Sequence, residues 1–160
     1  LLQNPLFFIK NALNCSEFCC IDNQTKEFLK QTPPPIKTVL AHGTFIPEID
    51  SKSIDFIYSL MVLQHIHLDD HKQILRQLVS FLKPNGLFLC QFPSENSGYY
   101  KKTKFVNTYS RQQINELVTS TCPGVKLNIF TGNLALYADN FQNCSPNQTR
   151  EFFALIQNPA

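Results

Sequence analysis

Three histidines and two aspartates crowd into residues 65–71, where the chain reads HIHLDDH. Imidazole nitrogens and carboxylate oxygens are the ligands with which proteins hold zinc, and a bound metal can activate water for hydrolysis. The ligands of such a metal-dependent hydrolase would be His65, His67, Asp69 and His71. The complete pattern of such hydrolases is H-x-H-x-D-H, and here Asp70 stands at its last histidine position while His71 comes one residue late. A site for two metal ions also needs further histidines downstream, and no histidine follows His71. We therefore predict no metal site here, and we expect His67 and His71 to be solvated near a helix N-terminus.

A strand, a helix and a second strand are predicted to position this stretch, within Ser53–Pro93. Residues 54–61 form a short apolar run rich in β-branched and aromatic side chains, and the apolar residues that follow position 70 recur with the period of an amphipathic helix. Asp69 and Asp70 stand where an N-cap is expected, and the sequence KPNG should end the helix in a turn before the second strand. Such a βαβ unit predicts a parallel sheet covered by helices.

Local signals predict the remaining elements. Before the βαβ unit we expect helices at residues 4–13 and 24–31, strands at Glu17–Ile21 and Lys37–Ala41, and a loop at His42–Lys52. After it we expect a polar loop at Ser94–Thr108 and then a helix, which begins with a capping box at Ser110 and Gln113 and ends at Cys122-Pro123-Gly124. Two strands at 125–131 and 134–139 should follow, joined as a hairpin by Gly132-Asn133. A last helix is expected near Pro146, with Phe152, Phe153 and Ile156 as its apolar residues. This order indicates one α/β domain, residues 1–160, with an antiparallel edge.

The composition limits the classes of function. The chain has 160 residues, of which 43% are hydrophobic. Its net charge of +2 is too small to indicate nucleic acid or a membrane surface as the partner, and we expect neither. No apolar run approaches the roughly 18 residues of a membrane-spanning helix. The six cysteines lack the spacing of metal ligands, so we predict reduced, partly buried thiols and a cytoplasmic location.

The phrase SIDFIYSLMVLQHI, the helix end LKPNG and the following GLFLCQFP together resemble a class I S-adenosylmethionine-dependent methyltransferase. The resemblance runs from Glu17 to Ala138. It implies a Rossmann-like methyltransferase fold with a mostly parallel sheet and an antiparallel C-terminal hairpin. It also implies transfer of a methyl group from S-adenosylmethionine to a small or medium-sized acceptor molecule.

The resemblance further implies which residues form the site. The positions expected to line the cofactor are Asp22, Asn23, His42, Gly43, Thr44, Ser59 and Leu60. The carboxylate of Asp22 could accept hydrogen bonds from both ribose hydroxyls of the cofactor, and capping of the next helix is the equally weighted alternative. His65 lies where a methyl acceptor would approach and could act as its general base, the alternative being a structural histidine bonded to backbone.

One part of the family's pattern is missing from the sequence. The glycine-rich turn E-x-G-x-G-x-G, where backbone amides approach the cofactor, has no counterpart, because none of the five glycines forms G-x-G and none precedes Asp22. The only methionine, Met61, is internal. We therefore expect a chain truncated at or just after the glycine-rich motif, without the first strand of the sheet. A non-catalytic methyltransferase-like remnant or interaction module is the alternative function.

Overall fold

The structure is a computed structural model that describes residues 18–22, 36–40, 44–46, 49–60, 62–96, 106–133 and 150–160. The chain divides into two compact units, Leu1–Ile49 and Asp50–Ala160, and each is described here by itself. The helices predicted at residues 4–13 and 24–31 and the strand predicted at residues 134–139 lie outside the described residues. The prediction of a single domain over residues 1–160 stays a prediction.

The first unit contains two parallel strands, β1 (Phe18–Asp22) and β2 (Ile36–Leu40). Phe18 lies opposite Ile36, and Asp22 lies opposite Leu40, so both strands end at the same edge of this small sheet. The two strands predicted in this region are confirmed, each displaced by one residue. Parallel pairing of these strands agrees with the predicted α/β class.

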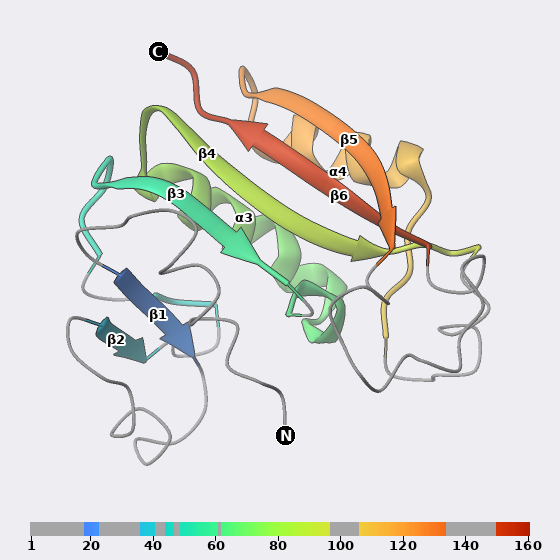
Figure 1. Cartoon of the computed structure of the whole chain (residues 1–160), viewed down its shortest axis with the longest axis horizontal. Coiled ribbons are helices and arrows are strands. Elements are labelled where there is room, and N and C mark those ends of the chain that lie inside the picture. The colour runs from blue at the N-terminus through green and yellow to red at the C-terminus, as the bar shows by residue number, and fades with distance from the viewer. Residues whose placement is uncertain are drawn as a thin grey trace. The chain divides into compact units, whose positions relative to one another are not determined.

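The second unit contains a four-stranded sheet in the order β3-β4-β6-β5 (Figure 1). Its strands are β3 (Ile54–Ser59), β4 (Leu82–Pro93), β5 (Lys126–Asn133) and β6 (Arg150–Gln157). The β3–β4 pair is parallel, whereas β6 is antiparallel to both of its neighbours. The predicted βαβ unit and the antiparallel C-terminal edge are therefore confirmed.

Two helices, α3 (Leu68–Phe81) and α4 (Arg111–Thr121), cover one face of this sheet and contact each other (Figure 1). Each helix buries one apolar stripe, as its sequence period predicts. The fully buried side chains of the unit include Leu75 of α3, Ile114 and Val118 of α4, Phe88, Cys90 and Phe92 of β4, and Ala154 and Ile156 of β6. The core thus lies between the helices and the two central strands. No helix among the described residues is long and apolar enough to cross a membrane.

The two helices begin differently. Helix α4 begins with the predicted capping box, in which Gln113 N–H donates to the Ser110 hydroxyl and Ser110 N–H donates to the Gln113 side chain. The predicted capping of α3 by Asp69 and Asp70 is wrong, because His67 occupies the N-cap and makes no capping hydrogen bond with its side chain. Both aspartates lie instead in the first turn of α3, where negative charge favours a helix N-terminus.

Helix α3 ends at Phe81, directly before Leu82 and the sequence KPNG. The predicted turn before the second strand is not found, because KPNG lies inside β4, where it bulges out of the β3–β4 ladder. Ile54 lies opposite Leu82, but Phe56 lies opposite Leu87, so residues 83–86 form the irregularity. Asn85 has a positive φ of 63°, which asparagine tolerates better than most residues. A Cβ atom at Gly86 would lie 2.9 Å from the Lys83 carbonyl oxygen and 3.1 Å from that of Ile54, so the close backbone approach requires glycine.

Two predictions near the C-terminus are wrong. Gly132-Asn133 does not form a hairpin loop, because both residues continue β5 and pair with Glu151 and Arg150 of β6. A Cβ atom at Gly132 would lie 2.6 Å from the Phe153 ring, so this glycine makes room for a side chain rather than for a turn. The predicted last helix is strand β6, because a short apolar run fits a buried strand with a partner on each side as well as it fits a helix.

Candidate active site

The carboxyl ends of the parallel strands β3 and β4 form the edge at which open α/β sheets bind their ligands. Ser59 is the last residue of β3 and lies opposite Cys90 of β4. Leu60 follows it, and both side chains are half-buried. The predicted cofactor positions Ser59 and Leu60 therefore lie at the carboxyl edge of this sheet, and their cofactor role stays a prediction.

His65 ends a short 3₁₀ helix, η1 (Leu63–His65), just beyond β3. Its side chain is exposed, whereas the neighbouring Gln64 is only 2% exposed. The Nε2 atoms of Gln64 and His65 are 3.1 Å apart. Because an amide nitrogen can only donate, the His65 Nε2 atom accepts this bond, and neutral His65 carries its proton on Nδ1. His65 in this arrangement offers an N–H donor to a ligand, and its basic nitrogen is engaged by Gln64.

The backbone around η1 is fixed by Asn107, which lies far away in the sequence. Asn107 N–H donates to the Gln64 carbonyl oxygen at 3.0 Å, and the Asn107 amide group donates to the Ile66 carbonyl oxygen at 2.7 Å. Within the segment itself, His65 N–H donates to the Val62 carbonyl oxygen. The segment that presents His65 is therefore clamped by the residues that precede α4.

His71 lies behind this segment and is 1% exposed. Its Nε2 atom is 2.8 Å from the Leu63 carbonyl oxygen, and its Nδ1 atom is 2.8 Å from the Tyr109 hydroxyl. Burial lowers the pKa of His71 below its ordinary value of 6.5, an effect that hydrogen bonds to backbone carbonyls and the charge of Asp70 partly oppose. Our expectation that His71 is solvated is wrong.

The same bonds argue against the metal-dependent hydrolase. Both ring nitrogens of His71 are occupied, while His67 is exposed and lies 3.3 Å from an exposed Asp69 carboxylate oxygen. Across the described ranges, no group of three histidine, cysteine, aspartate or glutamate side chains is arranged to hold a metal ion. The HIHLDDH sequence supplies the N-cap residue of α3, His67, and the buried, doubly hydrogen-bonded His71.

Tyr109 connects this cluster to the end of β4. Its N–H donates to the Pro93 carbonyl oxygen at 2.8 Å, and its own carbonyl oxygen accepts from Glu95 N–H at 3.0 Å. Its ring meets the edge of Phe92 with centroids 5.1 Å apart. Burial raises the pKa of the Tyr109 hydroxyl, so this group stays protonated. The buried side chains of His71 and Tyr109 consequently join residues 62–66 to the end of β4.

The remaining predicted cofactor positions belong to the first unit. Asp22 is the last residue of β1, and Thr44 lies half-buried in a turn that follows β2. Asn23, His42 and Gly43 lie outside the described residues. The cofactor role of all five stays a prediction.

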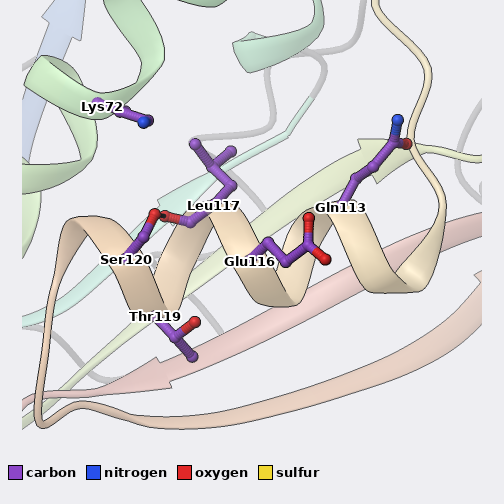
Figure 2. Close-up of a pocket in the computed structure, with 6 residues that line it drawn as sticks. All are labelled: Lys72, Gln113, Glu116, Leu117, Thr119 and Ser120. Atoms are coloured by element: carbon purple, nitrogen blue, oxygen red, sulfur yellow. Dashed lines mark hydrogen bonds between the residues drawn. The ribbon is translucent and has the colours of Figure 1, made fainter.

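A surface groove of about 600 Å³ lies between α3 and α4 (Figure 2). Its lining consists of Lys72 from α3 and of Gln113, Glu116, Leu117, Thr119 and Ser120 from α4. Leu117 is its only half-buried side chain, and the others are exposed. The groove contains none of the predicted site residues, and its open polar walls resemble an ordinary helix–helix surface rather than a reaction site.

The sequence alone did not identify Gln64, Asn107 or Tyr109 as parts of this site. Asn107 and Tyr109 contact residues 38 to 43 positions earlier, and no local pattern encodes such pairings. A signal for the burial of His71 was available, since it lies three, four and seven residues before Ile74, Leu75 and Leu78 on the apolar face of α3.

A family model described as "Methyltransferase domain" matches residues 15–123. Among solved structures, an S-adenosylmethionine-dependent methyltransferase of Methanosarcina mazei is similar with a TM-score of 0.72 and 12% identity, over 98% of this chain and 87% of that chain. Phosphoethanolamine N-methyltransferase 2 of Haemonchus contortus, in complex with phosphomonomethylethanolamine and S-adenosylhomocysteine, is similar with a TM-score of 0.70 and 14% identity, over 99% of this chain and 47% of that chain.

A third similar structure is the 4+2 cyclase SpnF, with a TM-score of 0.69 and 8% identity over 98% of this chain and 71% of that chain. A search of curated proteins found no significant sequence match. The structural likenesses confirm the predicted fold class, a partial Rossmann-like fold, and the metal-dependent hydrolase finds no support among them.

Proposed function

Because the chain belongs to the methyltransferase-domain family, we propose that it transfers a methyl group from S-adenosylmethionine to a small or medium-sized acceptor molecule. The family match over residues 15–123, on a chain with the fold of S-adenosylmethionine-dependent enzymes, is the observation that carries this proposal. We further propose a cytoplasmic location. It is supported by Cys90 and Cys122, which are free and buried, as expected in a reducing compartment.

The proposal of such a cofactor is supported by predicted site residues that stand at the carboxyl ends of parallel strands. Asp22 ends β1 with a carboxylate that can accept from two vicinal hydroxyls, and Ser59 ends β3 with a hydroxyl group. We propose that Asp22 binds the ribose and that Ser59 and Leu60 line the cofactor at the other parallel pair. S-adenosylmethionine would supply an activated methyl group on a positively charged sulfur. The protein's main task is then alignment of the acceptor.

We assign His65 to the acceptor side. With Nε2 accepting from Gln64, the neutral ring offers its Nδ1 proton as a donor that can orient an acceptor oxygen or nitrogen. His65 can take a proton from the acceptor only after it separates from the Gln64 amide. The expectation that His65 acts simply as a general base thus becomes a proposal in which His65 orients the acceptor before it takes a proton.

The test is calorimetric titration of S-adenosylhomocysteine into the purified chain, the Asp22→Ala variant and an Asp55→Ala control. Asp55 is an exposed β3 residue whose carboxylate pairs with Lys83 at 2.8 Å on the surface. We expect binding in about the micromolar range by the wild type and the Asp55 variant, and loss of binding in the Asp22 variant. Equal binding by all three chains would refute the role of Asp22.

A second candidate function is a non-catalytic methyltransferase-like module. The observation that favours it is the absence of any G-x-G sequence, since glycines at that turn let backbone amides approach the cofactor. This alternative predicts a chain that shows a folded circular dichroism spectrum and binds no S-adenosylhomocysteine. The same titration therefore separates the two functions.

A further inference from the structure

A buried histidine on α3 has no role in the proposed chemistry and yet makes two short hydrogen bonds. His71 occupies the apolar face of α3, where Ile74, Leu75 and Leu78 pack against the core. Burial of an imidazole is unfavourable unless both nitrogens find partners, and an apolar residue would avoid that requirement. The bonds of His71, rather than its packing, therefore distinguish this position from its neighbours.

The direction of these bonds follows from their chemistry. The Leu63 carbonyl oxygen can only accept, so the His71 Nε2 atom carries a proton and donates at 2.8 Å. In the neutral ring Nδ1 is then an acceptor, and the Tyr109 hydroxyl donates to it at 2.8 Å. We name this chain of two hydrogen bonds the Tyr109–His71–Leu63 relay.

The relay joins three segments that are far apart in the sequence. Leu63 belongs to η1 beyond β3, His71 to the second turn of α3, and Tyr109 to the stretch that leads into α4. Tyr109 is in turn bonded to the backbone of Pro93 and Glu95 at the end of β4. The relay thus connects the carboxyl ends of the two parallel strands through the interior of the unit.

We propose that His71 and Tyr109 are positioning residues of the methyl-transfer site. By fixing the Leu63 carbonyl group, the relay holds the short 3₁₀ turn from which Gln64 and His65 extend. This inference rests on the proposed function, because it assigns His65 to the acceptor side. Neither His71 nor Tyr109 needs to touch cofactor or acceptor.

The relay in this direction requires neutral His71, since a proton on Nδ1 would oppose the hydroxyl proton of Tyr109. The charged groups that act on His71 are Asp70, which favours its protonated form, and His67, which disfavours that form when charged. From the other packed elements it meets the uncharged Tyr109 hydroxyl and the backbone carbonyls of η1. Burial outweighs these contributions. The relay is therefore intact at neutral pH and is expected to loosen in acid.

Amide hydrogen exchange of the whole chain tests the proposal, with Tyr109→Phe as the variant and Thr121→Val as the control. Tyr109→Phe keeps the ring and removes only the hydroxyl, whereas Thr121→Val removes a buried hydroxyl that has no partner among the described residues. We expect the amides of His65 and Ile66, which close the 3₁₀ turn, to exchange about tenfold faster in Tyr109→Phe and at the wild-type rate in the control.

A second arm uses pH. After correction for intrinsic exchange, the wild type should show the same local acceleration as the pH falls below 6.5, the ordinary pKa of histidine. His71→Gln should remove this pH dependence, because its amide can still donate to the Leu63 carbonyl oxygen and does not titrate. Failure of the His71→Gln variant to suppress the pH dependence would assign it to another group.

Two outcomes would overturn the proposal. One is unchanged exchange of His65 and Ile66 in Tyr109→Phe, and the other is acceleration spread evenly over β4 and β6, which would indicate a purely structural role. Failure of the proposed function is read separately, as absence of S-adenosylhomocysteine binding by the wild type. Absence of binding leaves the exchange rates of the variants unaltered, so failure of the proposed function and failure of the positioning role can be told apart.

Discussion

Phe88 and Phe92 allow the contribution of one aromatic contact near the site to be measured. Both belong to β4, both are 0% exposed, and they face Ile156 and Phe152 of β6. Among the described residues, Phe92 forms a ring pair and Phe88 does not: the Phe92 centroid lies 5.1 Å from that of Tyr109, with an interplanar angle of 78°. Because the two positions lie four residues apart on the same face of one strand, substitution to leucine should remove similar apolar area and volume at each.

We expect Phe88→Leu to lower the free energy of unfolding by about 1 kcal/mol through lost burial. Phe92→Leu should lose that amount and also the edge-to-face pair, which contributes a further 0.5–1.5 kcal/mol or about 1 kcal/mol on average. The difference corresponds to roughly 2–4 °C in the unfolding midpoint for a chain of this size. Urea unfolding followed by far-ultraviolet circular dichroism measures it, provided that the m-value stays constant.

The contribution of the Phe92–Tyr109 ring pair is verified by comparing Phe88→Leu with Phe92→Leu in two Tyr109 variants. Tyr109→Phe retains the ring, so the extra loss at Phe92 should persist, whereas Tyr109→Leu removes the ring and should abolish it. Equal losses for Phe88→Leu and Phe92→Leu in the wild-type background would refute the assigned contribution of the ring pair.

Three further perturbations have expected outcomes. Ser110→Ala removes the acceptor for Gln113 N–H and should lower the free energy of unfolding, measured with urea, by about 1 kcal/mol. The control Ser120→Ala on the same helix should change it by no more than about 0.5 kcal/mol, and equal effects would contradict the capping box. Thr121→Val should raise the unfolding free energy by about 1 kcal/mol, because it removes a buried hydroxyl without a partner in the described chain, and a loss would reveal a hidden partner. The pKa of His71 is lowered in the folded state, so the free energy of unfolding is at its full value above pH 6.5 and should fall as the pH drops from there through the folded pKa. The urea midpoint of His71→Gln should lack this part of the pH dependence, because glutamine does not titrate.

The βαβ unit and α4 were predictable because their signals are local. The period of Ile74, Leu75 and Leu78 defines a helix face, and the Ser110–Gln113 spacing defines a helix start, without reference to the rest of the chain. The C-terminal strand was not predictable in this way. Phe152, Phe153 and Ile156 match a helical stripe, and only the presence of β4 on one side and β5 on the other makes that run a strand.

The candidate site was predictable in part for the same reason. Ser59, Leu60 and His65 follow a recognisable strand, so their place at its carboxyl end could be inferred from order alone. The partners that fix the segment around His65 could not be inferred, because the contacts from Asn107 and Tyr109 depend on how the end of β4 meets α3. An exposed His65 and a buried His71 differ in surroundings, not in local sequence.

A fold of this kind does not by itself decide the reaction, since the similar structures include a phosphoethanolamine N-methyltransferase and a 4+2 cyclase. The groups that the edge of the sheet presents to the substrate are one feature that can distinguish such proteins. In the site that we propose for this chain, that presentation depends on a turn held by Asn107 and by the Tyr109–His71–Leu63 relay. Methyl transfer gains mainly from alignment, so the residues that fix this turn should influence the reaction as strongly as those that contact the acceptor.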